Sequence, residues 1–583
     1  MFVALWLVSS PPNARAFVVN RDVVERPRHW TLANFDSRVS TNVVNPATHA
    51  IRYFFASDAY STTNQAAELN ALRAAFSQWQ AIPGTILKFE DAGLIAPVND
   101  VNNQDDRNTI YFKKGGTSYL VNGELDDIRG LLAYTYVSTF DDNTIAEADT
   151  VINGVDFTWF TDFSTVQSAG FFIEANMLHE VGHFIGLEHS PVGGATMFVR
   201  GLPGINTQAG LSRDEISAAL SLYPQAATPA TLGTLQGRVT INGAGVFGAV
   251  VTLEDMQGNI AAGTVTRPSG NYELPALPPE NYFARVTPLD PESGSSLAFA
   301  VRGSDISPDF STVQTNFLPA TNQPVTLRAG AFTALNFAVT GGSPRFRITW
   351  MRPPTDLADL RAAVHAPTTI NLGQSNFFVG VYSLDLPASG ARFAITGDGL
   401  TLGAPQFLPQ AISGMNLISI PIDVARNATP GLRSFVVQQG TNVAYANGFL
   451  EILPAFPDFN FDGLDDRFQR KSFPLFTAPQ AGPKADPDGD GFTNEREFLA
   501  GSDPTDAASF LFRIVKANLT AQGAFLNFET APGKKYQILR RDDFNSATWQ
   551  PAGSPISATN GISQFLDAAV SNSMRFYRVL ALP

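Results

Sequence analysis

The stretch HEVGHFIGLEHS, residues His179–Ser190, holds three of the six histidines in a chain of 583 residues. The second histidine follows the first by four positions and the third follows the second by six, with a glycine midway between the last two. A chain so poor in histidine has no compositional reason to place half of its supply within eleven positions. The spacing therefore predicts that the three side chains act together.

On a helix, residues four apart lie on the same face, so His179 and His183 can bind one metal ion. Gly186 can take a positive φ and end the helix, which lets the chain turn back and present His189 as a third ligand. Three neutral imidazoles leave a fourth tetrahedral position for water, as in a catalytic zinc site. Glu180 can act on that water as a general base. The alternatives are an ordinary core helix with incidental histidines and a metal site retained without catalysis.

The string resembles the zinc signature of the metzincins, and more narrowly that of the matrixins, in which a serine, here Ser190, follows the third ligand. Metzincins have a methionine turn beneath the zinc, and Met197 is the matching residue, a packing floor rather than a ligand. No tyrosine stands two residues after Met197, which argues against the astacin and serralysin branches. The resemblance extends through three flanking stretches, AAFSQWQAIPGTILKFED, IAEADTVIN and LSRDEISAALSLYP.

The resemblance implies a secreted zinc metalloendopeptidase that acts on proteins or peptides. Zn²⁺ would polarise the scissile carbonyl and lower the pKa of a bound water to about 7, and Glu180 would take its proton and pass it to the leaving amine. Two features depart from vertebrate matrixins. No histidine lies between His49 and His179 to hold a structural zinc, and there is no cysteine for a latency switch. The competing hypothesis is a surface adhesion or binding protein with a catalytically inactive metzincin domain.

The composition narrows the remaining classes of function. Lys and Arg number 39 against 53 Asp and Glu, a net charge of −14, which argues against nucleic-acid binding. The lack of cysteine excludes disulfides and thiolate metal sites. The beginning, MFVALWLVSSPPNARAF, combines an apolar run with an A-x-A site and predicts a signal peptide over residues 1–16, truncated at its start, and hence a secreted, extracellular or cell-surface protein. A buried N-terminal strand is the alternative. No other stretch has the roughly 18 apolar residues of a membrane span.

Residues 17–226 are predicted to form the matrixin-like domain, an α+β fold with a mixed twisted sheet and helices. HAIRYFFAS alternates apolar and polar residues from His49, as a half-buried strand does. An amphipathic helix follows behind a predicted Thr62–Gln65 capping box, and a last helix carries a second capping box in Ser212 and Glu215. Further strands are expected in TILKFED, NTIYFKK, LAYTYVSTF and DTVINGVDF, and one helix ends at the histidine cluster.

After Pro224, short strands and turn signals replace helical periodicity, which is typical of all-β sandwich modules. Residues 230–342 resemble the carboxypeptidase regulatory-like domain, through GRV at 237–239, GAVV at 248–251, GNY at 270–272 and NY at 281–282. Residues 343–454 resemble an Ig-like sandwich, and residues 508–583 a C-terminal β module of exported bacterial proteins. Contact with a cell surface, a glycan or a protein, and service as spacers, are the open alternatives for these modules.

Residues 455–507 form an acidic segment with two strings that follow the spacing of an EF-hand calcium loop. The second string, DPDGDGFTNERE, supplies Asp486, Asp488, Asp490, the Phe492 carbonyl, Asn494 and Glu497. The first, DFNFDGLDD, supplies Asp458, Asn460, Asp462 and Asp466, but Gln469 stands at its twelfth position and predicts a weaker site. The segment resembles thrombospondin type 3 repeats, in which Ca²⁺ would be structural and stiffen the joint to the C-terminal module. A solvated acidic linker is the alternative.

Overall fold

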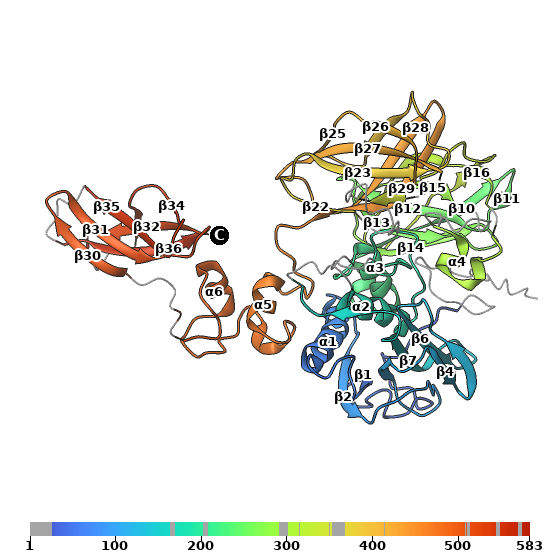
Figure 1. Ribbon diagram of the computed structural model, residues 1–583, viewed down its shortest axis with the longest axis horizontal. Coiled ribbons are helices and arrows are strands. Elements are labelled where there is room, and N and C mark those ends of the chain that lie inside the picture. Colours follow the sequence, from blue (N-terminus) through green and yellow to red (C-terminus); the bar gives the residue numbers. More distant parts are fainter. Residues whose placement is uncertain are drawn as a thin grey trace, which may run out of the picture. The chain divides into compact units, whose positions relative to one another are not determined.

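The computed structural model describes residues 26–163, 170–201, 208–290, 301–313, 315–348, 350–352, 368–412, 414–507, 509, 514–543, 548–568 and 574–582. The chain divides into two compact units, Met1–Phe459 and Asn460–Pro583, and each is considered by itself (Figure 1). The predicted signal peptide lies outside the described residues. None of the helices in the described ranges has the length and apolar character needed to cross a membrane.

A five-stranded sheet with the order β2-β1-β3-β7-β6 forms the centre of the first domain. Only β6, at the edge, runs antiparallel to its neighbour. The strands are β1 Ile51–Ala56, β2 Phe89–Ile95, β3 Thr109–Lys113, β6 Ala133–Thr139 and β7 Ile145–Asn153. Two short pairs flank the sheet: β4 Ser118–Val121 with β5 Glu124–Asp127, and β8 Trp159–Phe160 with β9 Phe171–Phe172. The mixed sheet with helices is the predicted α+β fold.

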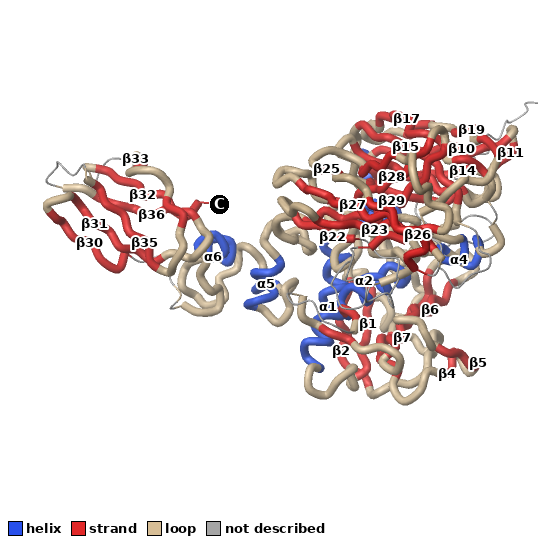
Figure 2. The backbone as a smooth tube through the Cα atoms, turned by 45° about the horizontal axis from the view of Figure 1, so that its top comes forward, coloured by secondary structure: helices blue, strands red, loops and turns tan. Residues whose placement is uncertain are grey.

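Three helices complete this domain: α1 Gln65–Ala81 and α2 Ile173–Phe184, both labelled in Figure 2, and α3 Arg213–Leu222, labelled in Figure 1. The fully buried Trp79 of α1 donates its indole N–H to the Leu178 carbonyl of α2 at 2.9 Å, which fixes the two helices against each other. The capping box of Ser212 and Glu215 is present on α3 as predicted. The predicted Thr62–Gln65 box is wrong. Asn64 is the N-cap of α1, and the Gln65 amide instead donates to the Ser57 carbonyl.

The second domain of unit 1 is built on two β-sheets, one around β10 and β14 and the other with the order β13-β12-β15-β17. Its strands are β10 Gly233–Ile241, β11 Ala244–Gly245, β12 Ala249–Asp255, β13 Ile260–Val265, β14 Asn271–Leu277, β15 Asn281–Pro288, β16 Phe317–Leu318, β17 Ala320–Thr326, β18 Phe332–Ala334, β19 Phe337–Ala338 and β20 Thr340–Gly341. Three short helices accompany them: η1 Thr228–Ala230, α4 Gly303–Ile306 and η2 Pro308–Phe310.

The third domain is a sandwich of the sheets β21-β23-β27-β25, to which β26 adds, and β22-β29-β28-β24, packed over one apolar core. Its strands are β21 Trp350–Arg352, β22 Thr368–Asn371, β23 Phe377–Ser383, β24 Arg392–Ile395, β25 Leu400–Leu402, β26 Gln406–Ile412, β27 Met415–Val424, β28 Gly431–Gln439 and β29 Asn442–Leu453. Two facing sheets of short strands are the all-β sandwich that the short strands and turn signals of the sequence predict.

Buried polar contacts join the three domains of unit 1. Arg285 of β15 is fully buried; it bonds Glu254 of the same domain and donates to Asn447 and Ser434 of the third domain. From the first domain, the Asp214 carboxylate accepts the Gly263 N–H of β13 at 2.7 Å. A buried charge loses its water, so each of these groups depends on the partner that the neighbouring domain provides.

Unit 2 combines two short helices with a C-terminal sandwich. The helices are α5 Asp466–Ser472 and α6 Asn494–Ala500, with η3 Pro479–Ala481 between them. The strands are β30 Ile514–Thr520, β31 Gly523–Glu529, β32 Lys535–Arg541, β33 Gln550–Pro551, β34 Ile556–Ser557, β35 Ile562–Asp567 and β36 Phe576–Leu582. The Tyr536 hydroxyl donates to the Ala500 carbonyl at 3.1 Å, so the helical segment packs directly on the sandwich.

Candidate metal centre

The three clustered histidines converge on one point. Helix α2 carries His179 and His183, whose Nε2 atoms lie 3.1 Å apart, and a nitrogen of each of the three rings lies within 4.8 Å of the others. Gly186 makes this convergence possible, because it has a φ of +101° and a Cβ there would overlap the Arg28 carbonyl. The chain therefore turns sharply after α2 and returns His189 to the helix.

A main-chain carbonyl holds the second nitrogen of every ring. The Nδ1 atoms of His179, His183 and His189 each lie 2.8 Å from a carbonyl oxygen, those of Thr196, Leu187 and Asp305 respectively. A donating Nδ1–H fixes the tautomer in which Nε2 keeps its lone pair for a metal. Burial also lowers the ring pKa values, to about 4 for His179 and about 3 for His183, and well below the ordinary value for His189, where the neighbouring rings add to the effect. The lowered pKa values favour the neutral form of each ring, which is the form that binds a metal.

A buried carboxylate accompanies the three rings. Glu180 Oε2 accepts a hydrogen bond of 2.7 Å from the Thr135 hydroxyl of β6. Burial raises the pKa of Glu180 to about 7, and the Thr135 bond works against that rise. Thr135 is not among the site residues predicted from the sequence. The alternation of the strand could place Thr135 on its inward face, but nothing in the sequence indicates that Glu180 is its partner.

Met197 lies under helix α2, where the methionine turn was expected. A Cβ on Gly182 would overlap the Met197 sulfur, so the two residues pack in direct contact. Gly182 precedes His183 on the same helix. The Met197 N–H donates to the Glu215 carboxylate at 2.9 Å, and its carbonyl accepts the Ser190 N–H at 2.8 Å. The capping glutamate of α3 thus also ties this turn to the residue that follows His189.

The centre opens into a cavity of about 620 Å³. All three histidines and Glu180 line it, together with residues Ala133–Thr135 of the sheet edge. Residues of the second domain line it too: Ser304, Ile306, Ser307 and Pro308. The cavity is large enough for several side chains of an extended peptide.

A second convergence of ligand groups lies in unit 2. Carboxylate oxygens of Asp486, Asp488 and Asp490 all lie within 4.8 Å of one another. Among the described residues, Asp488 Oδ2, Asp490 Oδ2 and Glu497 Oε2 are buried without a hydrogen-bond partner. Burial, assisted by these aspartates, raises the pKa of Glu497 to about 7. Buried oxygens without donors fit a cation, and Ca²⁺ prefers such ligands.

The other predicted calcium ligands have mixed surroundings. Asn494 donates to the Gln480 and Gly482 carbonyls, while its own side-chain oxygen has no partner among the described atoms. The Phe492 N–H donates to Asp490. In the first string, Asp462 Oδ2 accepts from the amides of Asn460 and Gln469 at 3.0 and 2.8 Å. Asp466 is fully buried at the start of α5, and Asp458 falls in unit 1. Over the described ranges, these residues form no cluster like that of the second string.

Comparisons with known families bear on the first two domains. The matrixin family model matches residues 46–224, and that of the carboxypeptidase regulatory-like domain matches residues 234–340. The resemblances drawn from the sequence are confirmed for these two domains, the first of which belongs to a family of zinc metalloproteases. No curated protein matches the chain.

Solved structures give weaker likenesses. The chain is 9% identical to the Bacillus anthracis TIE protein, at a TM-score of 0.14, covering 60% of this chain and 46% of that one. It is 9% identical to BcpA, the major pilin subunit of Bacillus cereus, at a TM-score of 0.13, covering 60% of this chain and 87% of that one. The chain thus spans less than half of the TIE protein.

We predict that His189→Ala lowers bound zinc well below one ion per chain, because two imidazoles cannot complete the site. Metal analysis after dialysis against a zinc buffer measures this. His29→Ala is the control, since His29 bonds the Pro27 carbonyl outside the cluster. Full zinc occupancy in His189→Ala would show that the third ligand lies elsewhere.

We predict that Gly182→Ala destabilises the protein by about 1–3 kcal/mol, because the added methyl group must displace the buried Met197. Thermal unfolding measures the loss. Gly561→Ala is the control, since no atom of the described residues lies within 4 Å of a Cβ at that position. Equal unfolding temperatures for the two variants would contradict the packing role of Met197.

Proposed function

We propose that the matrixin domain is a secreted zinc-dependent endopeptidase in which His179, His183 and His189 hold the metal and Glu180 is the general base. The observation that carries this proposal is the convergence of three neutral imidazoles, each fixed at Nδ1, beside a buried carboxylate in an open cleft. Zinc, when bound, polarises the scissile carbonyl and supplies a nucleophilic water at neutral pH.

The residues of the chain have separate tasks in this reaction. Strand β6 ends the sheet, and its residues 133–135 line the cleft, so an extended substrate can add to this edge through main-chain hydrogen bonds. Thr135 holds Glu180 Oε2 and thereby restrains the carboxylate, which lines the cleft. Glu180 takes a proton from the attacking water and returns it to the amine of the leaving peptide. The retained Glu180 favours this function over that of an inactive adhesion domain.

We also propose that the second acidic string binds a structural Ca²⁺. The partnerless oxygens of Asp488, Asp490 and Glu497 support this, because isolated buried carboxylates are costly and a cation would neutralise them. The first string is a weaker candidate, since the Gln469 amide already donates to Asp462.

We propose the same domain limits as those predicted from the sequence. They are 17–226 for the matrixin-like domain, 230–342 for the carboxypeptidase regulatory-like domain, 343–454 for the Ig-like sandwich, 455–507 for the acidic segment and 508–583 for the C-terminal β module. Contact of the β modules with a cell surface or glycan stays part of the proposal.

We predict that Glu180→Ala retains zinc and fold but loses activity on unfolded casein by about 10²–10⁴-fold, the usual contribution of a general base. Thr135→Val should keep zinc and lose activity by a smaller factor, because the carboxylate remains but is less well oriented. Cleavage assays with metal analysis of the same samples measure both effects. Activity of Glu180→Ala within a few-fold of the unaltered protein would place the base elsewhere, and chelator-insensitive or absent cleavage by the unaltered protein would exclude a zinc peptidase.

We predict that calcium protects residues 455–507 from limited proteolysis, because the ion neutralises the clustered carboxylates and orders the loop. EGTA should produce cleavage in this range and excess calcium should suppress it, as mass spectrometry of the fragments will show. Asp488→Asn with Asp490→Asn should abolish the protection. Glu495→Gln, a change of an exposed acid on α6, should not. The same cleavage with and without calcium would make the segment a plain linker.

A further inference from the structure

One segment of the carboxypeptidase regulatory-like domain, residues 301–308, contacts the candidate metal centre of the matrixin domain. The Asp305 carbonyl of α4 accepts the 2.8 Å hydrogen bond from His189 Nδ1, and the His189 N–H donates to the Ile306 carbonyl at 3.3 Å. Both the ring and the backbone of His189 are therefore held by a neighbouring domain, 116 residues further along the chain.

This segment is fixed at the point of contact. The Asp305 carboxylate is buried and accepts from two guanidinium groups, that of Arg200 at 2.8 Å and that of Arg302 at 2.9 Å. Arg200 belongs to the matrixin domain, so this ion pair crosses the domain boundary beside the metal centre. Charge-assisted bonds of this kind hold a group in place more firmly than neutral ones.

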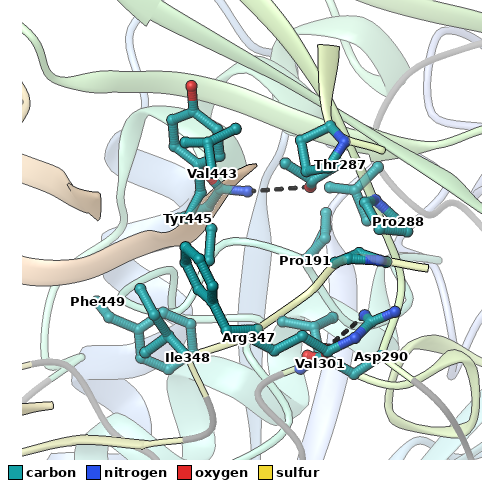
Figure 3. A pocket seen from close by; sticks show the side chains of 16 residues that line it. Pro191, Thr287, Pro288, Asp290, Val301, Arg347, Ile348, Val443, Tyr445 and Phe449 are labelled. Atoms are coloured by element: carbon teal, nitrogen blue, oxygen red, sulfur yellow. Dashed lines mark hydrogen bonds and ion pairs between the residues drawn. The ribbon is translucent and has the colours of Figure 1, made fainter. Parts of the chain in front are cut away.

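The beginning of the segment is anchored as well. The Val301 N–H donates to Asp290 Oδ2 at 3.0 Å, and Arg347 pairs with Asp290 Oδ1 at 2.9 Å (Figure 3). These residues surround a small cavity of about 50 Å³, which Pro191 of the matrixin domain and Tyr445 of the third domain also line. The segment therefore begins at a site where residues of all three domains of unit 1 meet.

The same segment forms part of the cleft surface. Ser304, Ile306, Ser307 and Pro308 line the cavity into which the histidines open. Ser304 and Pro308 are solvent-exposed, so they face the space that a substrate would occupy, whereas Ile306 is buried. A small and an apolar residue at the surface leave room for a substrate side chain there.

We propose that the carboxypeptidase regulatory-like domain completes the active centre of the peptidase. Asp305 is a positioning residue that orients His189 through its carbonyl, and residues Ser304 and Pro308 form a wall of the substrate cleft that selects among peptide side chains. This rests on the proposed function of the matrixin domain, but the positioning role concerns metal binding and stands apart from turnover.

The first experiment measures zinc affinity of the full chain by competition with a fluorescent chelator. Asp305→Ala keeps the carbonyl but removes the carboxylate that anchors it through Arg200 and Arg302, so the carbonyl is less well fixed against His189. We expect zinc binding to weaken by about 10-fold, the lower end of the effect of losing an outer partner of a ligating histidine. Asp309→Ala removes an equal charge from the adjacent turn, where Asp309 is exposed, and should leave the affinity unchanged. Equal affinities for the two variants would overturn the positioning role.

The second experiment measures binding of fluorescein-labelled casein peptides to zinc-loaded Glu180→Ala protein, which keeps the peptides intact. Adding Ser304→Trp fills the cleft wall and should weaken binding by about 10-fold with zinc content unchanged. Thr312→Trp adds the same bulk at an exposed position of the same domain that does not line the cleft, and should bind as the parent does. Equal peptide binding by the Ser304→Trp and Thr312→Trp proteins would show that Ser304 does not line the part of the cleft that binds substrate.

The outcomes also separate this inference from the proposed function. Weaker zinc binding in Asp305→Ala, without casein cleavage by the unaltered protein, would keep the positioning role and exclude the peptidase. Casein cleavage with unaltered zinc affinity and peptide binding in the variants would keep the peptidase and remove the second domain from its active centre. If Asp305→Ala does not fold, as circular dichroism will show, Asp305→Asn replaces it in the zinc measurement, because it keeps the shape of the side chain and removes the charge that pairs with Arg200 and Arg302.

Discussion

Three main-chain carbonyls bind the Nδ1 atoms of the three imidazoles in the candidate metal centre. The fold of unit 1 brings these three carbonyls close together around the rings. The Leu187 carbonyl comes from the turn that Gly186 permits, and the Thr196 carbonyl comes from the turn that Met197 anchors under α2. The third carbonyl comes from a β-sandwich domain. Because a ring bound at Nδ1 cannot rotate freely, these hydrogen bonds direct the Nε2 atoms at one point, which reduces the entropy lost when a metal binds.

The sequence predicted the parts of this centre that depend on local spacing. Two histidines four positions apart on a helix, a glycine at the required positive φ and a capping box at Ser212 all follow from side-chain identity over a few positions. The capping box predicted at Thr62 was wrong because the Gln65 amide found a better partner in the Ser57 carbonyl. A side chain that bonds a nearby main-chain carbonyl is thereby lost to the capping pattern.

The remaining parts had no sequence signal. Every residue has a main-chain carbonyl, so nothing in the amino-acid sequence distinguishes the carbonyl of Asp305 as the partner of His189. Thr135 could be assigned to the inward face of a strand, but its contact with Glu180 depends on how α2 crosses the sheet. The acidic loop shows the opposite case. The spacing of Asp486, Asp488 and Asp490 predicted their proximity, since a single tight loop brings them together.

The residues that follow His189 enter the interface between the domains. Gly193 and Gly194 lie so close to Phe449 and Leu432 of the third domain that a methyl group on either glycine would overlap them. Val192, fully buried, packs in a cluster with Ile260 and Leu432 from the two sandwich domains. The family boundary near residue 224 is therefore no natural point at which to divide the chain. A gene fragment ending there would encode a protein with an uncovered apolar loop beside its third histidine, and recombination that exchanged the sandwich domains would have to recreate that cover. The loop that follows the third histidine thus joins the first domain to both sandwich domains.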